Sequence, residues 1–199
     1  MSFTDNFGHP KGLLGRMMLV SMDKEHRPLM EWGFSQFELP KDANVIDIGC
    51  GGGYNVKRIL ARCPSGKAVG LDISEESVKK AKKVNKDELG KRCEILQGNV
   101  ENMPFPDKRF DIATAVETVF FWPDPKENFK EVFRVLSEKG LFVVICNYGN
   151  SDIDWEKKVP CMTRYTAEQI AEFMKNAGFD FIGIKKRETF FCVIGKRVL

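Results

Sequence analysis

The sequence predicts an α/β protein in which one doubly wound, seven-stranded mixed sheet carries helices on both faces. Three observations lead to this fold class. From Asp42 onward, short apolar runs alternate with segments of helical periodicity, which is typical of βαβ units on a parallel sheet. A glycine cluster follows the first apolar run. The last two strand-like segments are joined by too few residues for a crossover helix, so the last strand is expected to be antiparallel.

The apolar runs and capping signals place the elements in chain order. Strands are expected at residues 45–48, 68–72, 93–97, 110–116, 141–146, 181–186 and 189–195. Val56, Ile59 and Leu60 form the buried stripe of a first helix that ends before Pro64. Ser74 caps a second helix that is expected to reach about Leu89. Two more helices are expected at residues 126–136 and 166–176.

The length of 199 residues predicts one domain, or one domain with a small appendage. Residues 1–40 lie outside the alternating pattern and are expected to form an N-terminal helical cap of the same domain. Residues 41–199 form its main part. Met17, Met18, Leu19 and Met22 lie in the cap, where they either pack on the flank of the sheet or belong to a lid over a ligand.

Composition argues against several function classes. The formal net charge is +3, which predicts no basic face for nucleic acid. No apolar run approaches the ~20 residues that span a bilayer, and we recognise no secretory signal, so no membrane partner is expected. The six cysteines are scattered without a C-x-x-C pair. This scatter predicts free thiols, no metal site and a cytoplasmic location.

The glycine-rich turn after the first strand predicts a nucleotide-type crevice. Residues 45–53 are VIDIGCGGG, and glycines at such a turn let the backbone approach a ligand closely. A dinucleotide fingerprint G-x-G-x-x-G that begins at Gly49 needs glycine where the chain has Tyr54, and one that begins at Gly51 meets Val56. The turn therefore lacks the pyrophosphate-binding frame of dehydrogenases.

Two acids near this turn define the expected ligand. Asp47 lies inside the strand just before the glycines, where a carboxylate repels a pyrophosphate but attracts an ammonium group. Asp72 ends the next strand, 19 residues after Gly53 (72 − 53), close to the ~20 expected for an acid that binds ribose hydroxyls. An amino acid joined to a nucleoside without phosphates is S-adenosylmethionine (SAM). We therefore expect SAM as the cofactor and S-adenosylhomocysteine as the product.

From Asn44 onward, the sequence resembles the class I SAM-dependent methyltransferases, and within them the small-molecule branch often called the type 11 or ubiE-like group. Five blocks in order carry the resemblance: DIGCGGG at 47–53, GLDIS at 70–74, GNVENMPF at 98–105, FD at 110–111 and RVLSEKG at 134–140. The resemblance implies that residues 41–199 form a Rossmann-like methyltransferase domain that binds SAM.

The resemblance also implies which residues hold SAM. Gly49 and Gly51 contact its methionine part, Asp47 lies near its amino group, Asp72 binds the ribose and Ile73 flanks the adenine. Asn99 occupies the place where the family usually has an aspartate for the adenine amino group, and its carbonyl can accept the same N–H. The complete expected cofactor-binding set is Asp47, Gly49, Cys50, Gly51, Asp72, Ile73, Asn99, Val100 and Glu117.

Three residues are candidates for catalysis at the acceptor. Glu117 leaves the carboxyl end of the fourth strand and is a candidate base, with a solvated loop acid as the alternative. Tyr148 follows the fifth strand at the same edge and is a candidate hydrogen-bond donor. His26 is a candidate base by its ordinary pKa, although a lone histidine in a helix is more often a surface residue. Because positioning supplies most of the catalysis of methyl transfer, no obligatory acid or base is expected.

We therefore expect methyl transfer from SAM to a small-molecule acceptor, with a non-catalytic SAM-binding module or sensor as the alternative. Residues 117–122 lack the Asn/Asp-Pro-Pro-aromatic motif of enzymes that methylate bases, and the lysines at 79–83 are expected on a solvated helix face. Too few cysteines lie at strand ends for arsenic methylation. The aromatic run at 120–122 either walls an apolar acceptor site or belongs to the core.

Overall fold

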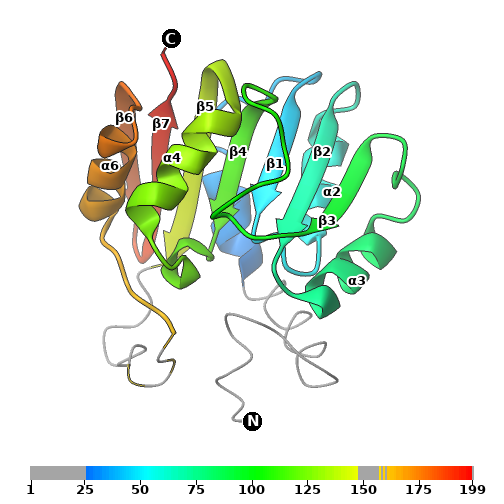
Figure 1. Cartoon of the computed structure of the whole chain (residues 1–199), viewed down its shortest axis with the longest axis horizontal. Helices are drawn as coiled ribbons and strands as arrows, with labels where there is room; N and C mark the ends of the chain where they lie inside the picture. Colours follow the sequence, from blue (N-terminus) through cyan, green and yellow to red (C-terminus); the bar gives the residue numbers. More distant parts are fainter. Residues whose placement is uncertain (1–25, 148–156, 158, 160, 199) are drawn as a thin grey trace.

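Seven strands form one mixed sheet, which confirms the predicted fold class (Figure 1). The computed structural model describes residues 26–147, 157, 159 and 161–198. The strands are β1 (Asn44–Ile48), β2 (Lys67–Asp72), β3 (Cys93–Gln97), β4 (Phe110–Val116), β5 (Leu136–Asn147), β6 (Phe181–Arg187) and β7 (Phe190–Lys196). Their order is β3-β2-β1-β4-β5-β7-β6, and β7 runs antiparallel to both of its neighbours. The predicted C-terminal hairpin is therefore confirmed.

The strand order reverses between β1 and β4. From β1 the chain builds outward to β2 and β3, then returns to place β4 and β5 on the other side of β1. All of these pairs are parallel, so the loops that follow β1 and β4 leave the same edge of the sheet and diverge. Such a switch point is where open α/β sheets bind their ligands.

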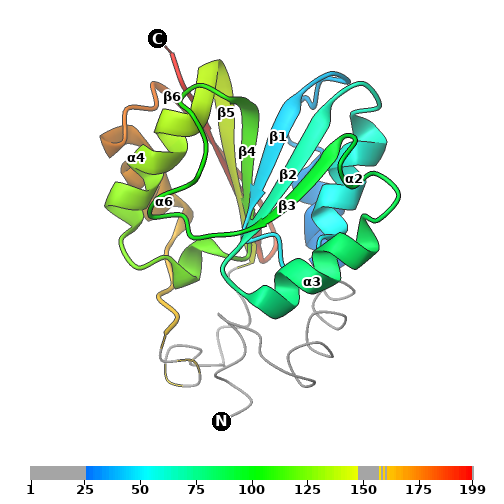
Figure 2. The same cartoon turned by 45° about the vertical axis from the view of Figure 1, so that its right-hand side comes forward.

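Helices cover both faces of the sheet (Figures 1 and 2). The elements are α2 (Tyr54–Arg62), α3 (Glu75–Val84), the 3₁₀ turn η2 (Val119–Phe121), α4 (Pro125–Val135) and α6 (Ala167–Asn176). One core cluster lies between the sheet and the pair α4 and α6, and the other lies under α2, α3 and residues 29–34. The predicted stripe of Val56, Ile59 and Leu60 is buried in the second cluster.

Helix α3 ends earlier than the sequence predicts. We expected it to reach about Leu89, but it ends at Val84 because Asn85 caps it. The buried Asn85 amide donates to the carbonyl oxygens of Ala81, at 3.0 Å, and Gly53, at 2.9 Å. A polar side chain that replaces the next helical turn in this way also ties the end of α3 to the glycine-rich turn.

The described part of the N-terminal segment packs on the sheet. Residues 26–33 are helical, and Leu29, Met30 and Phe34 are buried in the second core cluster. A Cβ atom on Gly33 would lie 2.6 Å from Ile145 Cδ1, so this helix approaches β5 closely. The methionines at 17, 18 and 22, with Leu19, lie outside the described residues, so the choice between flank and lid stays open.

The aromatic run after β4 belongs mainly to the core. Phe120 and Trp122 are buried in the first core cluster, and the Trp122 ring stacks on Phe142 with 6.2 Å between centroids. We therefore assign these two rings to the core and not to the wall of an acceptor site. Among the described residues, no helix is long and apolar enough to cross a membrane.

Candidate functional site

The glycine-rich turn packs closely against β2 and against the loop after β4, at the carboxyl edge of the sheet. The backbone N–H groups of Gly49 and Cys50 both donate to the Leu71 carbonyl of β2, at 2.8 and 3.0 Å. Gly49 has a φ of +74°, and a Cβ atom there would lie 2.1 Å from Thr118 Oγ1. Only glycine satisfies both the dihedral angle and the contact. The turn after β1 and the loop after β4 are thus fitted to each other.

Asp72 joins the end of β2 to this turn. Its Oδ2 accepts from the Gly51 N–H and its Oδ1 accepts from the Ser74 N–H, both at 2.8 Å. A carboxylate has about four acceptor sites on its two oxygens, more than these two contacts use. Ile73, the next residue, is 49% exposed, which is unusual for a large aliphatic side chain. A carboxylate beside an exposed apolar surface suits a ribose joined to a base.

Asp47 is buried at the end of β1 with one oxygen left without a partner. Thr114 Oγ1 donates to Asp47 Oδ1 at 2.7 Å, while Oδ2 has no hydrogen-bond partner among the described residues. Burial raises the pKa of Asp47 to about 7, against the opposing effect of the Thr114 hydroxyl. The Asp72 charge contributes to this rise in the pKa, and the Arg58 charge opposes it. A buried, unpaired carboxylate oxygen fits an ammonium group.

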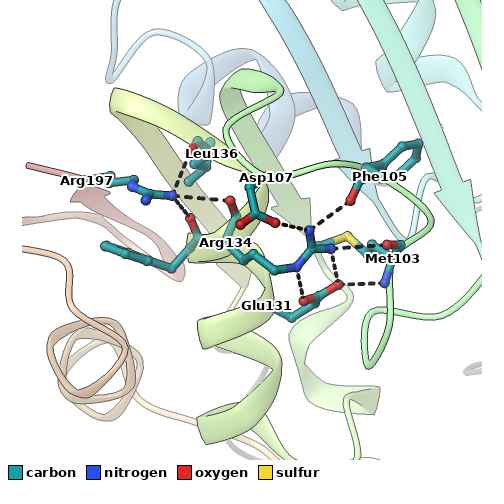
Figure 3. Close-up of polar contacts among 8 residues, drawn as sticks. Met103, Phe105, Asp107, Glu131, Arg134, Leu136 and Arg197 are labelled. Atoms are coloured by element: carbon teal, nitrogen blue, oxygen red, sulfur yellow. Dashed lines mark hydrogen bonds and ion pairs between the residues drawn. The ribbon is translucent and has the colours of Figure 1, made fainter. Parts of the chain in front are cut away.

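Asn99 and Val100 lie on the loop between β3 and β4. An arginine network holds residues 103–107 of this loop (Figure 3). Arg134 of α4 binds Glu131 through two nitrogens, both at 2.7 Å, and also donates to the Phe105 carbonyl at 2.8 Å. The Met103 N–H in turn donates to Glu131 at 2.7 Å. Arg134 also reaches the Met103 carbonyl and Asp107 on the same loop. Bidentate, charge-assisted contacts of this kind fix geometry well.

Glu117 lies directly after β4, at the same edge of the sheet. Its φ of +53° lies in the left-handed region that a non-glycine residue rarely adopts. Its Oε1 accepts from the Asn147 N–H at the end of β5, and its Oε2 lies 3.9 Å from His26 Nε2. Burial raises the pKa of Glu117 to about 7, opposed by the Asn147 N–H and the charge of Arg164. Strain and burial together mark a candidate functional group.

The structure therefore brings most of the predicted site residues to one edge. Asp47, Gly49, Gly51, Asp72, Ile73 and Glu117 gather around the ends of β1, β2 and β4. His26 comes to Glu117 from a different part of the chain. Tyr148 lies outside the described residues, so its role stays a prediction. Within the described ranges, no group of three or more His, Cys, Asp or Glu side chains could hold a metal ion.

Two predicted cofactor contacts do not turn their side chains toward this edge. Cys50 is buried in the second core cluster; its backbone N–H donates to the Leu71 carbonyl of β2, and its carbonyl accepts from the Gly53 N–H within the turn. Val100 is buried in the first core cluster. Any contact of Cys50 or Val100 with a ligand must therefore come from backbone atoms and not from the side chain.

Sequence reasoning missed Thr114, Thr118 and Arg134 as parts of the site. Thr114 carried a signal, because it is the one polar residue within the apolar run of β4 from Ile112 to Val116. The contact of Thr118 with Gly49 depends on how two loops far apart in the chain meet, and no local pattern indicates it. Arg134 begins the block RVLSEKG that carries the family resemblance, but the backbone carbonyls and the aspartate that it binds lie on the loop between β3 and β4.

Comparison with known proteins identifies the fold and the family. A family model described as a methyltransferase domain matches residues 46–144, about half of the chain. The Bacillus subtilis protein YdaC, an uncharacterized methyltransferase, is 27% identical over 88% of this chain and 95% of its own length. The 2-methyl-6-phytyl-1,4-hydroquinone methyltransferase of Arabidopsis thaliana is 30% identical over 73% of this chain. The chain spans only 42% of that plant protein.

A solved structure shows the same fold. The SAM-dependent methyltransferase of Aquifex aeolicus superposes with a TM-score of 0.75 at 23% identity, over 92% of this chain and 98% of that one. The described residues offer what SAM requires: an unpaired buried carboxylate oxygen at Asp47, a ribose-type acid at Asp72 and an exposed apolar side chain at Ile73. The chain therefore belongs to the class I SAM-dependent methyltransferases, in the type 11 group, with SAM as its cofactor.

Proposed function

We propose that this chain transfers the methyl group of SAM to a small-molecule acceptor that loses a proton as it is methylated, with Glu117 as the group that receives the proton. The observation that carries the proposal is Glu117 itself: a partly buried acid with a pKa of about 7, held at a positive φ beside His26. A base with a pKa near the working pH is the most effective one.

The cofactor half of the proposal assigns one role to each residue. Asp47 Oδ2 receives the α-ammonium group, Asp72 accepts from the ribose hydroxyls, and Ile73 covers one side of the adenine. Asn99, on the loop secured by Arg134, is the residue proposed for the adenine amino group. Its side chain contacts Glu101 two residues along, at the backbone N–H and at the carboxylate. Bound there, SAM supplies a methyl group on a cationic sulfur that is already activated for in-line displacement.

The acceptor half of the proposal assigns the proton. The Asn147 N–H holds one Glu117 oxygen, which leaves the other turned toward His26. As the acceptor gains the methyl group, its proton passes to the Glu117 carboxylate. His26 then receives the proton from Glu117. Tyr148 follows Asn147 in the chain and is proposed to donate a hydrogen bond to the acceptor.

A hydroxylated ring is the acceptor class that we favour. The plant relative is named for a hydroquinone with a phytyl chain, and methylation of such a ring at carbon or at oxygen releases one proton. Release of that proton is the step for which a partly buried acid with a pKa of about 7 is suited.

The test is release of S-adenosylhomocysteine from SAM with a panel of acceptors. The panel holds hydroquinones with and without a prenyl chain, the corresponding quinones, which lack the hydroxyl protons, and small amines. We expect turnover with hydroquinones and none with the quinones. Tight binding of S-adenosylhomocysteine without turnover on any acceptor would instead indicate the SAM-binding module or sensor.

A further inference from the structure

Thr114 is a polar residue of β4 that lies beside Asp47 of the neighbouring strand β1. In the register of the two parallel strands, Asp47 is paired with Thr114. Thr114 is wholly buried, and its hydroxyl lies 2.7 Å from Asp47 Oδ1 and 3.4 Å from the Ile46 carbonyl oxygen. A hydroxyl has one proton to donate, so the shorter contact to the carboxylate is the hydrogen bond that matters.

This hydrogen bond fixes which carboxylate oxygen remains available. With Oδ1 held by Thr114, the carboxyl plane of Asp47 is set, and Oδ2 is the oxygen without a partner among the described residues. We propose that Thr114 is a positioning residue for cofactor binding, whose hydroxyl orients the Asp47 carboxylate so that Oδ2 receives the α-ammonium group of SAM. The inference rests on the placement of that ammonium group at Asp47 in the proposed function.

The arrangement has a consequence for the dependence of binding on pH. The groups that face Asp47 are Asp72 at the end of β2, Asn55 and Arg58 on α2, and Thr114 on β4. Among them the Thr114 hydroxyl is the hydrogen-bond donor that favours the ionised form most. Without it, Asp47 ionises at higher pH, and an ammonium ligand then binds well only at higher pH.

The experiment measures the Kd of S-adenosylhomocysteine by titration calorimetry from pH 6 to pH 9. Thr114→Val keeps the shape of the side chain and removes the hydroxyl. Loss of a hydrogen bond to a charged group predicts binding that is weaker by about tenfold to hundredfold at pH 7. The loss should shrink by pH 9, and Thr114→Ser should restore the wild-type Kd and pH profile.

Ser77→Ala is the matched control, because Ser77 is also fully buried and its hydroxyl has no partner among the described residues. It removes a buried hydroxyl from α3, away from Asp47, and should leave the Kd unchanged at every pH. If Thr114→Val does not fold, Thr114→Cys provides a weak donor of similar size and should give a Kd between the two extremes. A wild-type Kd and pH profile in a folded Thr114→Val or Thr114→Cys variant overturns the inference.

Asp47→Asn separates failure of this inference from failure of the proposed function. If Asp47→Asn leaves the Kd unchanged, the ammonium group is not at Asp47 and the proposed placement is wrong. If Asp47→Asn weakens binding but Thr114→Val does not, only the role of Thr114 is wrong. In the Asp47→Asn background, Thr114→Val should add nothing to the loss, and two fully additive losses would show that Thr114 acts independently of Asp47.

Discussion

The two edges of the sheet use acidic residues in opposite ways. At the carboxyl edge, Asp47 is buried and Glu117 is partly buried, and burial raises the pKa of each to about 7. At the amino edge, Asp111 accepts from the Asn44 N–H and from Ser137. Glu138 forms a 2.6 Å ion pair with Lys108 that lowers its pKa below the ordinary value.

The difference shows where the fold gives up stability for function. Asp111 and Glu138 at the amino edge are hydrogen-bonded or ion-paired at the surface, and the charged form of Glu138 suits the folded state. Acids at the carboxyl edge are placed where charge is unfavourable until a ligand arrives. Residues that oppose stability in this way are functional-site candidates, and here they coincide with the switch point between β1 and β4.

The largest expected effect compares Glu117→Gln with Glu138→Gln. Glu117→Gln removes the proposed proton acceptor and should lower kcat by about 10²–10⁴-fold with an active acceptor. Glu138→Gln, the same chemical change at the other edge, should leave kcat at the wild-type value. The measurement is steady-state release of S-adenosylhomocysteine, and equal losses in both variants would refute the contrast.

The next effect is on folding stability, where Asp47→Asn and Asp111→Asn should have opposite signs. Asp47 has a folded-state pKa of about 7 against an ordinary value of 3.8. The unfolded chain therefore releases this proton first, and stability falls as pH rises from about 4 to 7. Asp47→Asn removes that penalty and should stabilise the protein without cofactor at pH 8 by roughly 2–4 kcal/mol, while having little effect at pH 4.

Asp111→Asn provides the control for that experiment. Its carboxylate oxygens accept from Asn44 and Ser137, and an amide cannot accept through both positions. It should therefore destabilise the protein by about 1 kcal/mol at pH 8. Urea unfolding of the cofactor-free protein at pH 4 and pH 8 measures both variants. Destabilisation by Asp47→Asn at pH 8 would show that burial of Asp47 carries no cost in the folded state.

Local sequence patterns predicted nearly all of the fold. Alternation of apolar runs and helices gave β1 to β5 in order, and the short connection between residues 186 and 189 gave the C-terminal hairpin. The end of α3 was wrong because Asn85 binds the Gly53 carbonyl, 32 residues away in the chain. The start of β5 was also wrong, since Leu136 already pairs with Phe110 before a shift in register. Both errors come from contacts that no local pattern contains.

Some residues of the candidate site could likewise be predicted from local patterns, and others depend on contacts between distant parts of the chain. Asp47, Asp72 and Glu117 could be predicted because they lie at the ends of strands, and topology brings strand ends together. The role of Thr114 could not be predicted, since it depends on the register of β4 against β1, 67 residues apart. The core-facing side chains of Cys50 and Val100 depend likewise on how the turn and loop settle on the sheet.

The smallest expected effect concerns the ion pair of Lys108 with Glu138. Both side chains are about half exposed, so water and salt screen the attraction between them. Lys108→Met should therefore leave the unfolding midpoint in urea close to that of the wild type at pH 7, and 0.5 M NaCl should abolish any difference. Because the pKa of Glu138 is lowered, any contribution is present above the ordinary value of 4.5 and is lost as pH falls. A large, salt-insensitive loss would mean that the amino edge also contains acids on which the fold depends, and the contrast between the edges would then be one of degree.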